Sequence, residues 1–139
     1  MSTTLNYAST LPKASDASGN VEGTIGEHVF ETHAGTVILH EGSVLLTLID
    51  RHDDGSAEEI YIRFSDNATP DQHLSLENQR TQEAWISFKT PTAPFAIQCT
   101  NATLHIETLV LIPLEVKGTL KGETDDPDYP VAIAFHMTA

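Results

Sequence analysis

The last third of the chain alternates apolar and polar residues with a period of two. The alternation covers residues 104–110, 114–121 and 131–137, and the runs are separated by Pro113 and by an acidic segment, 123–130. Because successive side chains on a strand point to opposite faces, this period predicts strands with one face toward water. Antiparallel sheets can leave one face to solvent, so an antiparallel meander is expected here.

A second pattern predicts a hairpin near the middle of the chain. Residues 43–49 (SVLLTLI) and 60–64 (IYIRF) flank the turn-forming triplet DDG at 53–55. The first run is apolar on both parities, since Leu45 and Ile49 fall on the face opposite its other apolar residues. A strand of this kind is typical of a layered core that covers both of its faces.

Weaker patterns add strands on either side of this hairpin. Residues 21–35 read as a strand in which Gly26 favours a bulge, and residues 84–88 and 95–99 show short alternating runs. Residues 66–82 are polar and irregular, and a loop of this length often carries function. They contain either a short helical turn or a strand fragment.

Together these patterns predict an all-β fold of about eight or nine strands without a helix of useful length. Such a chain forms an antiparallel β-sandwich or a small antiparallel β-barrel, and periodicity alone does not separate them. The sandwich is favoured, because residues 43–49 suit a layered core and glycines at barrel corners are few. Residues 20–139 are expected to form one domain, and residues 1–19, rich in Ser, Thr and Ala, a flexible N-terminal arm.

Charge narrows the range of functions more than composition does. Twenty Asp and Glu against seven Lys and Arg give a formal net charge of −13, whereas 40% apolar residues is ordinary for a globular domain. Because nucleic-acid affinity depends mostly on Lys and Arg contacts with phosphates, direct nucleic-acid binding is disfavoured, as is binding to anionic membranes. The charge serves solubility, or it complements a basic protein partner.

Two acidic clusters and one aromatic residue are candidate partner-binding residues. One cluster belongs to the central hairpin, and the other to ETDDPDYP (123–130), where two prolines reduce the entropy lost on binding. Trp85 falls on the outward parity, where a large aromatic ring is a candidate hot spot. Solvated turns that protect the sheet from aggregation are the alternative interpretation of the clusters. The candidates are Asp53, Asp54, Glu58, Glu59, Trp85, Asp125, Asp126 and Asp128.

Seven histidines raise the question of a metal site. His28 and His33 are five residues apart, so on one strand they point to opposite faces. His105 and His136 fall on the outward parity of strands that could be neighbours, but no third ligand is identifiable. We therefore expect no metal and no cofactor.

Other chemical signatures are incomplete or absent. Residues 50–55 (DRHDDG) begin like a calcium-binding loop, but His52 and Tyr61 stand where oxygen ligands are required. Cys99 falls on the inward parity and is expected to be a small buried residue, and a single cysteine forms no intramolecular disulfide. Nucleophile-elbow, P-loop and dinucleotide-binding motifs do not occur. We expect no catalytic residues, which disfavours an enzyme without excluding one.

The first twenty residues have no cationic start and no apolar run of signal-peptide length. No stretch approaches the roughly 18 apolar residues of a membrane helix. A cytoplasmic location is therefore expected, and leaderless export stays open.

The sequence favours an acidic, non-enzymatic binding module for a protein partner, preferably a basic one, as an inhibitor or immunity-like protein would be. One alternative is a small β-barrel that binds or isomerises a hydrophobic small molecule. Another is a structural subunit of an assembly. Exposed sheet edges in an open sandwich would also favour a homo-oligomer.

Overall fold

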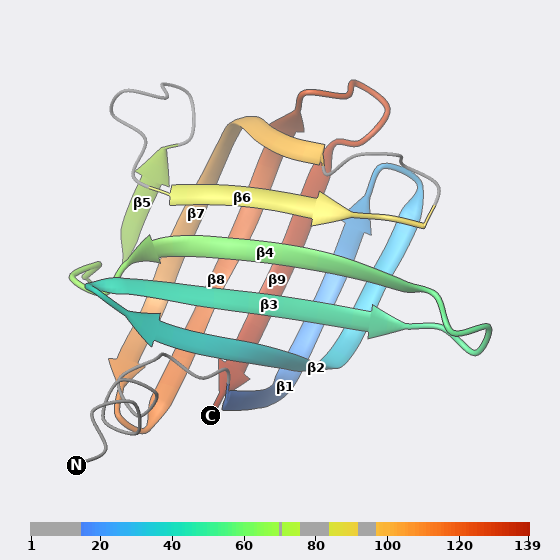
Figure 1. The fold of residues 1–139 in the computed structure, drawn as a ribbon. Helices are drawn as coiled ribbons and strands as arrows, with labels where there is room; N and C mark the ends of the chain where they lie inside the picture. The colour runs from blue at the N-terminus through green and yellow to red at the C-terminus, as the bar shows by residue number, and fades with distance from the viewer. Residues whose placement is uncertain (1–14, 70, 76–83, 92–96) are drawn as a thin grey trace, which may run out of the picture.

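The chain forms a closed antiparallel β-barrel with one additional strand (Figure 1). The computed structural model describes residues 15–69, 71–75, 84–91 and 97–139. Eight strands form the ring in the order β1, β2, β3, β4, β6, β7, β8 and β9, and β9 pairs with β1 to close it. The strands are β1 Ser15–Ile25, β2 His28–His40, β3 Ser43–Arg51, β4 Ala57–Ser65, β5 Gln72–Ser75, β6 Ala84–Lys89, β7 Ile97–Leu111, β8 Leu114–Thr124 and β9 Val131–Thr138.

Neighbouring strands of the ring differ in the number of residue pairs that join them. β3 and β4 pair over nine registered positions, from Ser43 opposite Ser65 to Arg51 opposite Ala57. Among the described residues, β6 and β7 pair at two positions, Ser87–Gln98 and Phe88–Ile97. Further along the same edge of β7, the short strand β5 pairs with residues 103–106. In the described ranges, no helix is long and apolar enough to span a membrane.

The predicted sandwich is wrong, and the small barrel given as its alternative is correct. All nine described strands belong to one sheet. Glycines in β1 and β8 allow close approach of the neighbouring backbone: a Cβ on Gly23 would lie 2.0 Å from the Ala132 oxygen, and one on Gly122 would lie 2.4 Å from the Asn101 oxygen. Both glycines have φ of +153°, which side-chain-bearing residues rarely adopt. They let β1 approach β9, and β8 approach β7, more closely than a residue with a side chain would allow.

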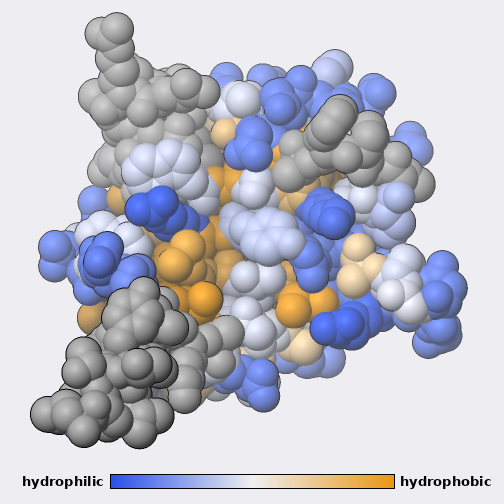
Figure 2. All heavy atoms as spheres, in the orientation of Figure 1, coloured by the Kyte–Doolittle hydropathy of each residue, from blue (hydrophilic) through white to orange (hydrophobic). Residues whose placement is uncertain are grey.

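β3 shows why its two-sided apolar pattern was misleading. Leu46 and its inward neighbours are buried in the barrel, whereas Leu45 and Ile49 lie half-buried on the outside. Leu45 is flanked in register by Ile38 and Arg63 on the same outer surface, so no second sheet is needed to cover it. Figure 2 shows hydrophobic residues on either side of a band of intermediate hydropathy in the middle of this outer face, and hydrophilic residues at its margins.

The central hairpin and the C-terminal meander are both confirmed. In the hairpin, Val44 lies opposite Phe64 and Leu48 opposite Ile60, as the turn at 53–55 predicts. β7, β8 and β9 form the meander as successive antiparallel pairs.

The alternation in β7 shifts near its end. The β7–β8 register is irregular between Ile106 and Thr108, so the parity that faces the core changes there. Val110 is therefore 45% exposed, whereas Leu109 and Leu111 pack against the core. A bulge of this kind re-aims the side chains that follow it.

Gly26 forms a turn between β1 and β2 and not the expected bulge within one strand. Its φ is +60°, and its N–H donates to the Pro130 oxygen at 2.7 Å. β1 begins at Ser15, so residues 15–19 of the segment expected as an arm are strand, and residues 1–14 lie outside the described ranges. The fragment expected around Leu74 is β5, and the remainder of that loop, from residue 76, also lies outside them.

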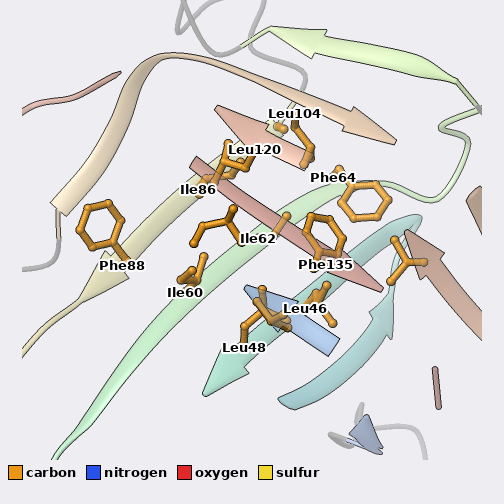
Figure 3. Packing of buried hydrophobic residues seen from close by; sticks show 14 of the residues in the cluster. Leu46, Leu48, Ile60, Ile62, Phe64, Ile86, Phe88, Leu104, Leu120 and Phe135 are labelled. Atoms are coloured by element: carbon orange, nitrogen blue, oxygen red, sulfur yellow. The ribbon is translucent and has the colours of Figure 1, made fainter. Parts of the chain in front are cut away.

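Apolar side chains from all eight barrel strands fill the interior. Figure 3 shows Phe64, Ile62, Leu104, Leu120 and Phe135 directed toward a common centre, and each is at most 2% exposed. An eight-stranded ring is just wide enough for side chains to fill. Burial of each such side chain stabilises the fold by about 1.5–3 kcal/mol.

Candidate functional site

Both predicted acidic clusters lie at the same end of the barrel. β1, β3, β6 and β8 run in one direction in an antiparallel ring, so the turns that follow them share an end (Figure 1). The turns after β1, β3 and β8, at 26–27, 52–56 and 125–130, contain no Lys or Arg. We call their carboxylates the acidic end: Glu27, Asp53, Asp54, Asp125, Asp126 and Asp128.

The β8–β9 turn is held by the buried hydroxyl of Thr124. This oxygen lies 2.7 Å from the Asp126 carbonyl oxygen and 3.0 Å from that of Tyr129, and it accepts the Asp126 N–H. The Tyr129 ring stacks on His28, 6.0 Å between centroids, which ties this turn to the β1–β2 hairpin. The turn therefore presents its carboxylates from a fixed backbone.

The β3–β4 turn is held by Asp54. Its Oδ1 accepts hydrogen bonds from the Ser56 hydroxyl at 2.6 Å and the Ser56 N–H at 2.9 Å, and these bonds lower the pKa of the Asp54 carboxyl. Asp50 Oδ2 accepts the Glu31 N–H at 3.3 Å, which links the base of the hairpin to β2. Asp53 at the tip is exposed.

Glu58 is not part of the exposed acidic surface. It shares the inward parity of β4 with Ile60, and its side chain is only 7% exposed. Oε1 lies 3.0 Å from His52 Nε2, whereas Oε2 has no hydrogen-bond partner in the structure. The hydrogen bond with Glu58 raises the pKa of His52, and the nearby Asp50 and Asp54 carboxylates add to the effect.

Other predicted contact residues are also engaged within the protein. Glu59 accepts a short hydrogen bond from the Tyr61 hydroxyl, and this bond raises the pKa of Tyr61 to about 12. Asp125 Oδ1 accepts the Gln98 N–H at 3.3 Å, and Asp126 Oδ1 accepts the Asp128 N–H at 3.0 Å. The most freely presented carboxylates of the acidic end are therefore Glu27, Asp53 and Asp128.

Trp85 does not lie with the acidic end. It is 49% exposed and lies opposite Arg63 in the register of β4 and β6. Arg63 follows Glu59 by four positions in β4, so Trp85 lies away from the β3–β4 turn. The Arg63 guanidinium lies over the indole ring, with Cζ 5.2 Å from the ring centroid. Beside this pair is a hollow of about 490 Å³ that also borders Ser43, Asn67 and other residues around the β4–β5 connection.

A larger, open groove of about 680 Å³ runs over the outer side of β1, β9 and β8. Its floor includes the exposed small residues Ala132 and Ala134, with Glu22 and Lys121 at its sides. Small side chains explain the depression, because the flanking outward residues are longer.

The histidines do not converge on a metal. β8 lies between β7 and β9, so His105 and His136 are not cross-strand partners. His105 instead stacks on His73 of β5, 4.1 Å between centroids, and lies 2.7 Å from Asp71 Oδ1, whereas His136 lies 2.7 Å from Glu115 Oε2. Within the described ranges, no three His, Cys, Asp or Glu side chains are arranged to hold an ion, at residues 50–55 or elsewhere.

Cys99 is buried, as its parity predicts. Burial raises the pKa of its thiol to about 12, and the Asp125 carboxylate adds to the effect. Since the thiolate is the reactive form of cysteine, this environment does not produce a nucleophile.

Two features of the site were missed from the sequence. Glu27 was not singled out, because residues 21–35 were interpreted as one strand and the turn at Gly26 was not recognised. Arg63 was not singled out as a candidate, because its position beside Trp85 depends on β4 pairing with β6, which skips β5. Pairing between strands that do not follow each other in sequence leaves no local signal.

No protein-family model matches the chain, and comparisons with curated proteins and with solved structures found no match.

Proposed function

We propose that this protein is a non-enzymatic binding module whose acidic end engages a basic region of a partner protein. The observation that carries the proposal is the convergence of three turns that contain carboxylates and no Lys or Arg at one end of the barrel. A basic partner gains favourable long-range electrostatic energy there, which speeds association and selects against acidic competitors.

The rigidity of these turns supports the proposal. Hydrogen bonds to Thr124 and Asp54 hold two of the turns, and the Gly26–Pro130 hydrogen bond joins the third to its neighbour. Side chains carried on an ordered backbone lose less conformational entropy on binding than those of a mobile loop. The barrel interior is filled by apolar side chains, so the proposal places binding on the outside.

The test compares retention of proteins from a lysate of the native host by the wild type and a triple variant. Glu27→Gln, Asp53→Asn and Asp128→Asn remove three negative charges from exposed side chains that form no hydrogen bond with another described residue. At about 50 mM salt we expect the wild type to retain a basic protein that the variant loses, and at about 500 mM salt both should lose it.

A second triple variant controls for net charge. Asp16→Asn, Glu22→Gln and Glu31→Gln remove the same charge from exposed side chains of β1 and β2 outside the acidic end. This variant should retain the partner like the wild type, and purified partner should bind both with similar affinity. Equal losses in the two variants, or no retained basic protein, would contradict the proposal.

A further inference from the structure

The hollow beside Trp85 has the size and lining of a small-molecule site. Its volume of about 490 Å³ lies within the range of ligand pockets, about 300–1,000 Å³. Its wall combines the apolar Phe64, Ala68 and Leu74 with polar groups from Ser43, Asn67 and Gln72. It is separate from the acidic end and is not part of the function proposed above.

Arg63 provides a positive charge at this hollow. Its registered neighbours on the outer face are Leu45 and Trp85, and no carboxylate of the described residues lies within ion-pair distance of it. Lys117, by comparison, pairs with Glu107 at 3.8 Å. The planar set of N–H donors of the Arg63 guanidinium matches a carboxylate in two parallel hydrogen bonds.

The remaining polar groups of the lining include hydrogen-bond donors. Gln72 Oε1 accepts the Thr69 N–H at 2.8 Å, which leaves the Gln72 amide NH₂ to donate elsewhere. The Ser43 hydroxyl also borders the hollow. A lining rich in donors favours a ligand that is rich in acceptors.

The indole of Trp85 supplies the apolar surface. The ring is held from one side by Arg63 and is 49% exposed, so a flat ligand body can still pack against it. Stacking on Trp85 also restricts the Arg63 side chain, which lowers the entropy cost of binding an anion.

We propose that this hollow binds a small organic carboxylate with a flat apolar body. The carboxylate accepts hydrogen bonds from the Arg63 guanidinium, and the body of the ligand packs against Trp85. The net charge of −13 disfavours anions at long range, so the local pairing with Arg63 has to supply the affinity.

The test uses intrinsic fluorescence, since Trp85 is the single tryptophan of the chain. The full-length protein is titrated with benzoate and with benzamide, which share a ring and differ in charge. We expect a saturable change with benzoate in the millimolar range and about tenfold weaker binding of benzamide. Chemical-shift changes of the Trp85 indole N–H provide a second readout if fluorescence is insensitive.

Variants separate the role of Arg63 from that of charge alone. Arg63→Gln should weaken benzoate binding by about tenfold or more, and Arg63→Lys should give an intermediate loss. Lys89→Gln removes one positive charge from the outer face of β6, where Lys89 pairs in register with Glu59, and should leave benzoate affinity within about twofold. Circular dichroism and thermal melts establish that each variant is folded.

Three results would overturn the proposal. These are equal affinity for benzoate and benzamide, unchanged benzoate binding by folded Arg63→Gln, and no saturable change in either readout. The triple variant of the acidic end should bind benzoate like the wild type, so failure of one proposal does not imply failure of the other.

Discussion

Glu58 lies buried in the barrel wall with one carboxylate oxygen that has no hydrogen-bond partner in the structure. Among the described residues, His52 is the only side chain that forms a hydrogen bond with Glu58, and His52 is itself exposed. Removing one partner from a buried polar pair leaves the other desolvated and unpaired, which is costlier than losing the bond itself. The two residues should therefore behave as a unit.

The His52–Glu58 pair predicts a specific pH dependence. Because the folded-state pKa of His52 is raised above its ordinary value of 6.5, the pair contributes stability that is fully present below about pH 6.5 and is lost as pH rises through the folded pKa. NMR titration should show His52 titrating above pH 6.5, and Glu58→Gln should return its pKa toward 6.5. A His52 pKa that Glu58→Gln leaves unchanged would contradict the role of the pair.

The Cys99 thiol should be unreactive toward thiol reagents in the folded protein. Since burial raises the pKa of its thiol to about 12, a thiol reagent at pH 8 should leave the native protein unmodified and label one thiol per chain in denaturant. Mass spectrometry after brief alkylation measures both. Rapid native labelling would mean that the N-terminal end of β7 opens readily.

Parity predicted the direction of most side chains correctly, and its failures have local causes. Trp85 faces outward and Cys99 inward, as their positions in alternating runs predict. Glu58 is two positions from Ile60 and therefore shares its inward parity, so its burial could have been predicted from the sequence. Its position next to an acidic turn suggested a solvated side chain instead. Val110 was assigned to the wrong face because the bulge after Ile106 adds a residue without any Gly or Pro to mark it.

At the scale of strands, Gly23 and Gly122 allow close approach of their neighbouring strands. A side chain at Gly122 would collide with backbone atoms of β7 at 2.4 Å, and φ there is +153°. Backbone atoms cannot move aside as a flexible side chain can, so the strain must be relieved by separating β7 from β8.

Gly122→Ala should therefore destabilise the barrel. We expect a loss of about 1–3 kcal/mol, as for overpacking in a close-packed interior, measured by urea unfolding. Gly55→Ala is the control: φ is +89° there, but no atom lies within 4 Å of the added Cβ, so only the conformational cost of about 1–2 kcal/mol remains. A smaller effect at Gly122 than at Gly55 would contradict the steric argument.

Within the part of the chain that the structure describes, β6 and β7 share the fewest registered pairs of any neighbours in the ring. Two such pairs join them, against nine between β3 and β4. Hydrogen exchange should therefore be about tenfold or more faster for the amides of the β6–β7 pairs than for those of the β3–β4 hairpin. Equal protection would show that β6 and β7 open only when the whole barrel unfolds.

Strand pairings were predictable where strands follow each other along the chain. The β3–β4 hairpin has a DDG turn between alternating runs, and the β7-β8-β9 meander has short connections. β4 pairing with β6, and β5 leaving the ring to pair with β7, depend on contacts that no local pattern encodes. The hollow beside Trp85 is built from these non-sequential pairings, and it was therefore not predictable.

For the molecule as a whole, the pairing of β1 with β9 is what distinguishes a barrel from a sandwich. Alternation predicts inward and outward faces equally well for both architectures. What separates them is whether the sheet closes, and closure requires β9 to lie between β1 and β8. Gly23 and Gly122 allow close approach of their neighbouring strands, but glycine in a strand pattern also marks an ordinary bulge.

Net charge predicts a salt dependence of stability. With a formal charge of −13, the folded protein is destabilised by self-repulsion that added salt screens. Raising sodium chloride from about 10 mM to about 300 mM should raise Tm by a few degrees, as differential scanning calorimetry measures. Potassium chloride at equal ionic strength should act alike, and a Tm that falls with either salt would contradict the argument.

Closure of the ring through β1 and β9 also has a consequence for how the chain folds. The Thr138 hydroxyl donates to the Ser18 oxygen across 120 positions of sequence, so this junction forms only when β9 has left the ribosome. Until then, β1 has only β2 to pair with and its other edge is open. Contacts between distant segments also make folding slow, in the range of milliseconds to seconds for barrels of this kind. During synthesis, the unpaired edge of β1 is thus open to pairing with another chain.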